Sequence, residues 1–314
     1  MASGDELVDA KPISAPDPRD EVRRFYDQIG WQLVGEGVYQ NAHYEDLRPV
    51  ARQYIHNCHL RIARHLKPAG NLLLDAGSGP IQYPEYLEYS RHYRKRVCAD
   101  ISMTALIEAR KRIGEHGLFV LADVARLPFR SEAFDGAVSL HTIHHLPEHE
   151  HLNAYGELYR VLAAGSAAAI VNGWPSSPLM KAFEPLIRFT QRAQALLNRL
   201  KGQAAPSAAE TRESASIQKK ATQNNQRAKG TFTNRHDVKW IRNKVGAVIP
   251  IEILVWRSVS VRFLRALIHP NLGGRTWLRL LFWLEECFPH FFGEAGQYPL
   301  IIVRKPGRTE IDQA

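Results

Sequence analysis

The stretch from Asn71 to Pro80, Asn-Leu-Leu-Leu-Asp-Ala-Gly-Ser-Gly-Pro, decides the fold of this chain. Its three consecutive leucines predict a strand that is buried on both faces, as in a parallel sheet. The strand ends on Asp75, and Gly77 and Gly79 follow, so the backbone can turn sharply and approach a ligand without a Cβ in the way. A buried strand, a glycine-rich turn and a following helix predict a nucleotide-binding site at the carboxyl edge of an open α/β sheet.

The segments around this stretch alternate between strand and helix. Further strands are predicted at 96–100, 118–121, 134–140, 167–171, 247–256 and 298–304, with helices at 49–66, 83–89, 102–113, 149–162 and 234–245. This alternation predicts an α/β fold: a doubly wound, Rossmann-like sheet of seven mostly parallel strands with helices on both faces. Segments 178–200 and 263–292 are also expected to be helical, and they form cap insertions outside the alternation.

Changes in composition predict where the chain divides. Residues 1–20 are rich in acids and prolines, lack an apolar secretory core and are expected to be disordered. Residues 21–304 are expected to form one domain. Within it we distinguish a cofactor-binding core at 66–173, a basic helical insert or lid at 175–232 and a C-terminal substrate-side region at 233–304. Residues 305–314 form a tail.

The charge of the chain is concentrated in one segment. The chain has 314 residues and a formal net charge of +9, and the segment 175–236 holds eleven Lys or Arg against three acids. This segment is either a solvated, flexible linker or a surface for an anionic partner such as a lipid headgroup, a phosphorylated substrate or nucleic acid. Three well-separated cysteines suit a reducing cytoplasm, and no apolar run is long enough to predict a membrane span. We therefore predict a cytoplasmic protein, with peripheral membrane association as an option.

Three acids indicate which nucleotide binds. Asp75, Asp100 and Asp123 each end or follow one of three successive predicted strands, so they meet at one edge of the sheet. An acid before the first glycine suits a cationic group rather than a phosphate, the second acid suits a ribose, and the third suits an exocyclic amine. S-adenosylmethionine has these parts. A dinucleotide site needs G-x-G-x-x-G, and here Gln82 stands where the third glycine belongs.

Five pieces of the sequence resemble class I S-adenosylmethionine-dependent methyltransferases, in the methyltransferase type 11 group that includes the ubiquinone/menaquinone C-methyltransferases. The matching pieces, in order, are 72–79, 98–102, 121–129, 134–146 and 157–165. Two departures stand out. Ile81 occupies a position where the family often has a glycine, and about forty residues separate the last two strands, which usually form a tight hairpin.

The resemblance implies a set of cofactor contacts. Asp75 would act on the amino group, Asp100 on the ribose and Asp123 on the adenine, with Ile101 and Val124 on the two faces of the ring. The full implied set is Tyr26, Asp75, Ala76, Gly77, Ser78, Gly79, Asp100, Ile101, Ser102, Asp123, Val124, Ser139 and His141. Tyr26 comes from the lead-in segment, where it either closes over the cofactor or packs an N-terminal cap. Ser102 is also well placed to cap the helix 102–113.

The histidines after the fourth predicted strand are candidates for catalysis. His144, His141 and His145 either supply a general base or line the pocket. Their spacing crosses a strand end, a loop and a proline, so we expect no metal there.

The acceptor is less well defined. The loop Ser139-Leu140-His141-Thr142 lacks the acid, prolines and aromatic of base-amino methyltransferases, and no nucleophilic Pro-Cys is present, which disfavours nucleic acid. The helices 178–200 and 277–292 carry apolar and basic residues, which either pack as a cap or touch lipid headgroups. We therefore expect a small-molecule acceptor that is apolar, aromatic or lipid-linked. The alternatives are an NAD(P)-dependent Rossmann oxidoreductase and a non-catalytic partner protein that keeps the same fold.

Overall fold

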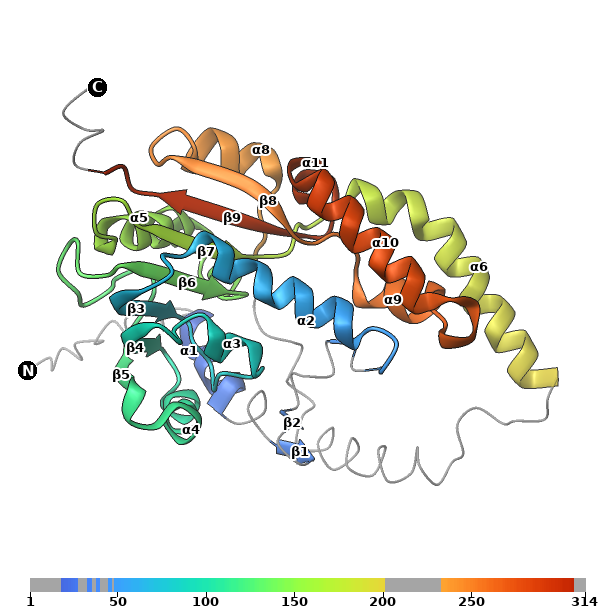
Figure 1. Cartoon of the computed structure of the whole chain (residues 1–314), viewed down its shortest axis with the longest axis horizontal. Helices are drawn as coiled ribbons and strands as arrows, with labels where there is room; N and C mark the ends of the chain where they lie inside the picture. Colours follow the sequence, from blue (N-terminus) through green and yellow to red (C-terminus); the bar gives the residue numbers. More distant parts are fainter. Residues whose placement is uncertain are drawn as a thin grey trace, which may run out of the picture.

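Seven strands form one sheet through the middle of the chain, in the order β5-β4-β3-β6-β7-β9-β8 (Figure 1). The computed structural model describes residues 18–27, 33–35, 38–39, 45–46, 48–200 and 233–307. The sheet strands are β3 (Gly70–Ala76), β4 (Tyr93–Asp100), β5 (Gly117–Leu121), β6 (Gly136–Leu140), β7 (Ala167–Val171), β8 (Ile251–Arg257) and β9 (Tyr298–Arg304). Strands β3 to β7 run parallel, and β9 is antiparallel to β7 and β8. The predicted doubly wound, Rossmann-like sheet is confirmed.

Strand β3 contains the three consecutive leucines Leu72, Leu73 and Leu74. Successive side chains on a strand point to opposite faces, so Leu73 and Leu74 enter two different hydrophobic clusters, and neither is exposed. The strand pairs with β4 on one side and β6 on the other. The chain order therefore reverses at β3, and this switch point opens a crevice at the carboxyl edge of the sheet.

Helices cover both faces of the sheet. On the face of Leu74 lie α5 (His151–Val161) and the helical segment that starts as α8 (Val238–Trp240) and continues to Val245. On the face of Leu73 lie the turn Arg61–His65, α3 (Glu85–Glu88) and α4 (Met103–Ile113). Burying both faces explains why the strands read as continuous apolar runs rather than alternating ones.

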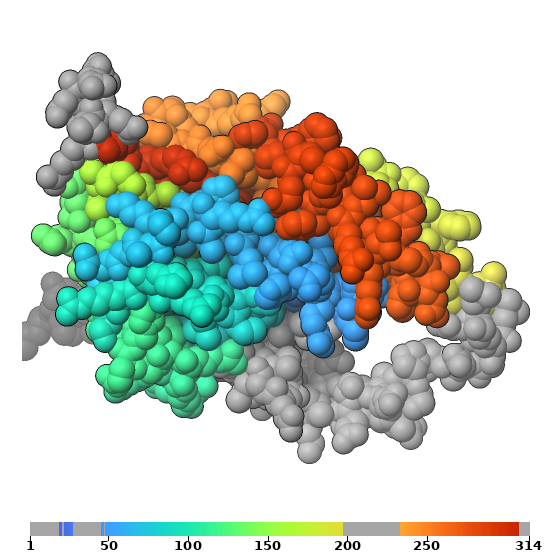
Figure 2. All heavy atoms as spheres, viewed as in Figure 1, coloured from blue at the N-terminus to red at the C-terminus, as the bar shows by residue number. Residues whose placement is uncertain are grey.

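A helical cap extends beyond one end of the sheet (Figure 1). It contains α2 (Arg52–Leu60), α6 (Pro178–Leu200), α9 (Val261–Leu267), α10 (Gly274–Cys287) and α11 (Pro289–Ala295). The helices α2, α6, α9 and α10 share a third hydrophobic cluster, which includes Tyr54, Ile187, Phe263 and Leu278, whereas α11 packs on β8. In the space-filling view, α2 and α10 lie side by side (Figure 2).

Several boundaries differ from the sequence-based expectations. The helix expected at 263–292 is divided into α9, α10 and α11, because Pro270 and Pro289 each begin a new turn and Gly273 adopts a left-handed conformation at φ +70°. The helix expected from residue 234 begins at Val238, where the Asp237 side chain caps it. The strand expected at 247–256 begins only after Pro250, which cannot donate a ladder hydrogen bond.

The N-terminal part adds α1 (Pro18–Phe25) and a small hairpin of β1 (Leu33–Gly35) and β2 (Val38–Tyr39). Residues 18–20, which were expected to be disordered, thus begin a helix. Residues 1–17, positions 201–232 of the expected basic insert and the tail after residue 307 lie outside the described residues. Within the described ranges, no helix combines the length and the apolar character that a membrane span requires.

Candidate functional site

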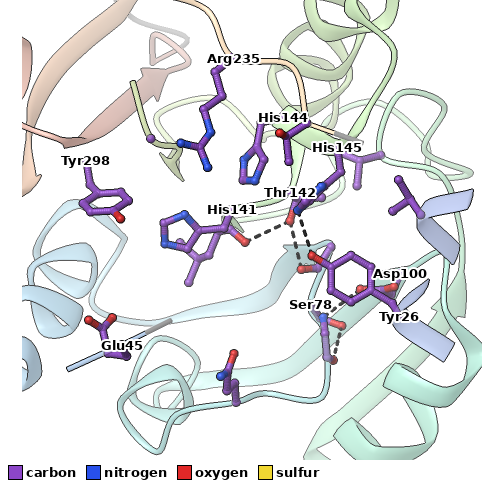
Figure 3. Close-up of a pocket in the computed structure, with 18 of the residues that line it drawn as sticks. Tyr26, Glu45, Ser78, Asp100, His141, Thr142, His144, His145, Arg235 and Tyr298 are labelled. Carbon is purple, nitrogen blue, oxygen red and sulfur yellow. Dashed lines mark hydrogen bonds between the residues drawn. The ribbon is translucent and has the colours of Figure 1, made fainter. Parts of the chain in front are cut away.

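A cavity of about 980 Å³ opens at the carboxyl edge of β3, β4 and β6. This volume is near the upper end of the roughly 300–1,000 Å³ of small-molecule sites, so it can hold a sizeable ligand or two smaller ones. One end is lined by the glycine-rich turn after β3, and we call it the glycine end. The opposite end is lined by Arg235, Arg257, Arg262 and Arg265, and we call it the arginine end. His141 lies between the two ends (Figure 3).

The turn at the glycine end requires glycine at two positions. Gly77 has φ +73° and Gly79 has φ +55°. A Cβ on Gly77 would lie 2.2 Å from Oγ1 and Cγ2 of Thr142, which is far inside contact distance. The Gly77 N–H donates to the carbonyl of Ala99 at 2.7 Å, so the turn is fixed to β4. These contacts leave backbone of the turn exposed to the cavity.

The structure explains how Ile81 can occupy a position where the family often has a glycine. Its φ is +56°, the left-handed region that favours glycine, although Ile is β-branched. Such a conformation costs on the order of 1–3 kcal/mol and persists only where the surroundings compensate. The Ile81 side chain is fully buried with Tyr86 and Leu106, and this burial offsets the strain. The backbone therefore keeps a glycine-like turn without the glycine.

Asp75 lies at the end of β3 and lines the cavity, but its charge is compensated. Arg96 on β4 is fully buried, and its Nη2 lies 2.5 Å from Oδ2 of Asp75, with Nε at 3.1 Å. Arg96 also donates to the carbonyl of Tyr86. From the sequence alone, Asp75 is expected to favour a cationic group of the ligand. Because Arg96 balances the charge, Asp75 cannot set that preference on its own.

Asp100 at the end of β4 connects the turn to the next helix. Its Oδ2 accepts from the N–H of Gly79 and its Oδ1 from the N–H of Ser102, both at 2.8 Å. Burial raises the pKa of Asp100 to about 6, although both backbone hydrogen bonds act in the opposite direction. Ser102 caps α4, with its Oγ accepting from the N–H of Ala105 at 3.1 Å and donating to Asp27.

Asp123 follows β5 and binds Arg19 of α1. Nη1 of Arg19 lies 2.9 Å from Oδ2 of Asp123, and the N–H of Ala125 donates to Oδ1 at 2.9 Å. Ile101 and Val124 line the cavity beside this carboxylate. Helix α1 therefore lies against the glycine end of the cavity.

Tyr26, which follows α1, points into the cavity (Figure 3). Its hydroxyl is hydrogen-bonded to Nε2 of His145 at 2.9 Å. The two rings meet edge to face, with centroids 5.5 Å apart. The lead-in segment is thus tied to the histidine loop, as the closing role considered from the sequence requires.

Two side chains of the histidine loop, His141 and His144, have lowered pKa values. His141 has φ +56° and packs edge-on against Trp256 and Tyr298, with ring centroids 5.2 and 5.8 Å away. Burial, and then the charge of Arg257, lower the pKa of His141 to about 3. His144 is hydrogen-bonded to Asn172 at 3.1 Å, and burial lowers its pKa well below the usual range. Among the described residues, no three His, Cys, Asp or Glu side chains are arranged to hold a metal ion.

Most of the residues expected from the sequence line this one cavity. These are Tyr26, Asp75, Gly77, Ser78, Gly79, Asp100, Ile101, Asp123, Val124, His141, His144 and His145. Three do not: Ala76 and Ser139 are fully buried within the sheet, and Ser102 is the buried helix cap.

The arginine end was not anticipated. Its residues come from α9, the end of β8 and the loop at 233–237, which are far apart in the sequence and separate from the motifs. The one available signal was the interleaving of arginine with aromatic residues between 256 and 265. Arg96 was missed because an arginine inside a short apolar strand gives no indication of its partner.

Comparisons with known proteins identify a family match and several solved structures of similar fold. Residues 74–170 match the family model described as "Methyltransferase domain". The search of curated proteins found no match. A solved geranyl diphosphate methyltransferase in complex with GPP and sinefungin is 15% identical, has a TM-score of 0.50 and aligns over 92% of this chain and 99% of its own.

Two further solved structures are similar to this chain over most of its length. Geranyl diphosphate C-methyltransferase from Streptomyces coelicolor A3(2) is 15% identical over 94% of this chain and 100% of its own, with a TM-score of 0.48. The [4+2]-cyclase SpnF is 16% identical over 95% of this chain and 100% of its own, also with a TM-score of 0.48. At these identities the likeness concerns the fold alone.

Proposed function

Because residues 74–170 are a methyltransferase domain, we propose that this chain is an S-adenosylmethionine-dependent methyltransferase that acts on a small molecule. The observation that carries the proposal is the glycine end of the cavity. There the left-handed turn at Gly77 and Gly79 meets two carboxylates, Asp100 and Asp123, from the ends of adjacent strands. A backbone turn and two hydrogen-bond acceptors suit a ligand with an aminoacyl group, a ribose and an adenine. The solved geranyl diphosphate methyltransferase with sinefungin binds a ligand of this kind in the same fold.

Each lining residue has a distinct task in this proposal. The free backbone of the turn holds the methionine part, Asp100 accepts from the ribose hydroxyls, and Asp123 accepts from the adenine amine. Ile101 and Val124 contact the two faces of the ring. When bound, S-adenosylmethionine supplies a methyl group on a sulfonium, already activated for displacement.

The protein contributes alignment rather than strong acid–base chemistry. Methyl transfer is an in-line displacement, so holding the acceptor in line and excluding water supplies most of the acceleration. His141 and His144 are neutral, but their lowered pKa values make them weak bases. This favours an acceptor atom that is already nucleophilic, or one that loses its proton easily. Their proposed role is to line the channel between the two ends.

The acceptor is proposed to have an aromatic or apolar body. Trp256, Tyr298, Tyr83 and Tyr86 line the cavity beyond His141. Flat rings bury apolar surface and stack on planar ligands.

A lipid-facing surface is compatible with such an acceptor. The segment of α10 and α11, with Phe288 between the two helices, exposes Trp277, Trp283, Phe288 and Phe291, each by 57–61%. Both helices are visible on the face shown in Figure 2. Exposed arginines, Arg275 and Arg279, lie on α10 as well. Aromatic residues interleaved with arginine are typical of helices that rest on anionic headgroups.

We propose that this surface contacts membrane lipid. Co-sedimentation with phosphatidylserine vesicles tests the proposal, and Trp283→Ser is the variant that we expect to bind more weakly. Equal binding of the variant would contradict this role.

Calorimetric titration with S-adenosylhomocysteine and, separately, with NADH tests the cofactor. We expect the first to bind and NADH to be excluded. Binding of NADH alone would favour the oxidoreductase alternative. Metabolite profiling with and without the gene would then seek product pairs separated by the mass of one methylene group, and absence of such pairs together with firm cofactor binding would favour a non-catalytic partner protein.

A further inference from the structure

The two ends of the cavity differ in their charged side chains. At the glycine end the lining acids are Asp75, Asp100 and Asp123, and the first and last of these are paired with Arg96 and Arg19. The arginine end has four guanidinium groups, Arg235, Arg257, Arg262 and Arg265, and Glu45 is the one acid among its described lining residues. In Figure 3, Glu45 and Tyr298 lie on one side of His141, and Asp100 lies on the other. The arginine end therefore has a positive excess directly beside the channel.

Part of this positive charge is balanced within the protein. Arg257 is paired with Glu45, and both are buried. Arg262 is at the outer edge, where Nη1 lies 2.8 Å from Oε2 of Glu184 on α6. Arg265 donates to the backbone carbonyl of Glu45 at 3.0 Å.

Arg235 is held over the cavity by its two neighbours. The N–H of Asn234 donates to the carbonyl of His144 at 2.8 Å, and the His236 ring stacks on Trp240 with centroids 3.6 Å apart. Between these anchors the Arg235 side chain extends toward the space between Tyr298 and His144 (Figure 3). No carboxylate of the described part of the chain forms an ion pair with it. The loop thus presents a guanidinium to the cavity rather than to a partner in the protein.

Gly173 allows the side chains of Arg235 and Tyr298 to lie close to the backbone. A Cβ on Gly173 would lie 3.4 Å from Nη1 of Arg235 and 3.4 Å from Cε1 of Tyr298. The guanidinium and the Tyr298 ring therefore lie against the same glycine. A planar cation beside an aromatic ring is suited to a ligand that joins an anionic group to an aromatic body.

Two buried donors in the same wall lack partners. Nε of Arg257 and Nε1 of Trp256 have no hydrogen-bond acceptor among the described residues, and both side chains line the cavity. The two residues are 2% and 1% exposed. Buried donors are normally satisfied, and these two add unused hydrogen-bonding capacity to this wall of the cavity.

We propose that the arginine end binds the oxyanion of an acceptor molecule, a carboxylate or a phosphate, while its aromatic or apolar body lies on Trp256 and Tyr298. This inference rests on the proposed methyltransferase function and names the class of its acceptor. Arg235 and Arg257 are the residues that recognise the oxyanion, because guanidinium groups match carboxylate and phosphate oxygens in pairs. A bound oxyanion would also offset the arginine charges that, after burial, depress the pKa of His141. The acceptor is thereby oriented with its anionic head away from the glycine end.

Binding of three small probes to the full chain, saturated with S-adenosylhomocysteine, tests this assignment. The probes are benzoate, phenyl phosphate and the neutral benzamide, and calorimetry measures each affinity. We expect at least one anion to bind about tenfold or more tightly than benzamide. Benzoate and phenyl phosphate together distinguish a carboxylate from a phosphate head. Equal affinity for all three probes, or no binding of either anion at millimolar concentration, would overturn the proposal.

Variants separate recognition by Arg235 from general surface charge. Arg235→Met keeps the length and removes the charge, so the preferred anion should lose about tenfold in affinity while benzamide is unaffected. Arg235→Lys should retain part of the preference, because it keeps the charge without the planar fork. Arg110→Met on α4 removes an exposed arginine outside the cavity lining and should change nothing. If Arg235→Met leaves both anion affinities intact, the proposal is wrong.

The two proposals fail in different ways. Loss of S-adenosylhomocysteine binding in the unmodified protein contradicts the methyltransferase function. Normal binding of that ligand without a preference for anions contradicts only the assignment of the arginine end.

Discussion

The carboxylate of Asp100 accepts a hydrogen bond from the backbone N–H of Gly79 at 2.8 Å, which joins the end of β4 to the turn after β3. The same carboxylate binds the N–H of Ser102 and sets the start of α4. One buried acid thus shapes the turn and also faces the cavity. Its protonation state should therefore affect ligand binding directly.

The affinity for S-adenosylhomocysteine should fall as the pH falls below about 6, where burial places the pKa of Asp100. The protonated carboxyl loses its charge, and charged hydrogen bonds are stronger than neutral ones. Asp100→Asn should bind about 1–3 kcal/mol more weakly at pH 7.5 and show a flatter pH dependence. Calorimetry at pH 7.5 and 5.5 measures both effects. A variant as pH-dependent as the wild type would exclude Asp100 as the titrating group.

Gly77→Ala should destabilise the protein by at least about 2 kcal/mol and abolish cofactor binding, because it adds left-handed strain to an overlap with Thr142. The double variant Gly77→Ala/Thr142→Gly removes the overlap and should recover part of the loss. Urea unfolding of the four proteins in this cycle gives the coupling energy. Simple additivity would show that Thr142 is not the obstacle.

Arg96→Met should cost about 3–5 kcal/mol of folding free energy, because it leaves the buried Asp75 carboxylate unpaired. Asp75→Asn/Arg96→Met should cost less, since no uncompensated charge remains. Chemical denaturation monitors both variants. If the double variant is as unstable as the single one, packing rather than charge explains the loss.

Stability should decrease as the pH falls from 6.5 toward 3, in part because His141 cannot be protonated in the folded state. Its folded pKa is lowered from 6.5 to about 3, first by burial and then by Arg257, with smaller opposing or supporting effects from Glu45, Arg235 and His59. In this interval the unfolded chain binds a proton that the native state does not, so the free energy of unfolding falls.

The raised pKa of Asp100 acts in the opposite direction. The native state binds a proton at Asp100 between pH 3.8 and about 6, where the unfolded chain does not. The stabilisation from this proton is therefore full below pH 3.8 and is lost as the pH rises through about 6.

The variant His141→Asn tests the contribution of the histidine, because Asn tolerates the positive φ of this position. The variant should show a flatter fall in stability between pH 6.5 and 5. An unchanged slope in urea titrations would rule out His141 as a contributor.

Tyr26→Phe should speed the dissociation of S-adenosylhomocysteine by about 2–10-fold, because it removes the hydrogen bond to His145 that holds the lead-in segment over the cavity. Stopped-flow displacement measures the rate. Arg24→Ala, an exposed change on the preceding helix α1, is the control. Identical rates for Tyr26→Phe and wild type would favour a purely packing role for this segment.

The sequence predicted the core of the site because the relevant properties are local. A strand of leucines, a glycine pair and an acid at a strand end are read from neighbouring residues, and adjacent parallel strands bring their ends together. Asp100 and Asp123 could therefore be assigned to one edge before the structure. Ser102 could be read as a helix cap for the same reason, and the cap explains why its side chain lies outside the cavity.

The remaining features depended on segments that meet only in three dimensions. No local pattern pairs Asp75 with Arg96, or places Thr142 where a Cβ on Gly77 would lie, because these contacts are set by the register between strands and the path of the loop after β6. The arginine end brings together residues from 235 to 265 with Glu45, across the α9 cap and the edge of β8. The sequence by itself determined the sheet and the glycine end, through backbone conformation and burial. Only tertiary packing decided which charges are compensated and which face the ligand.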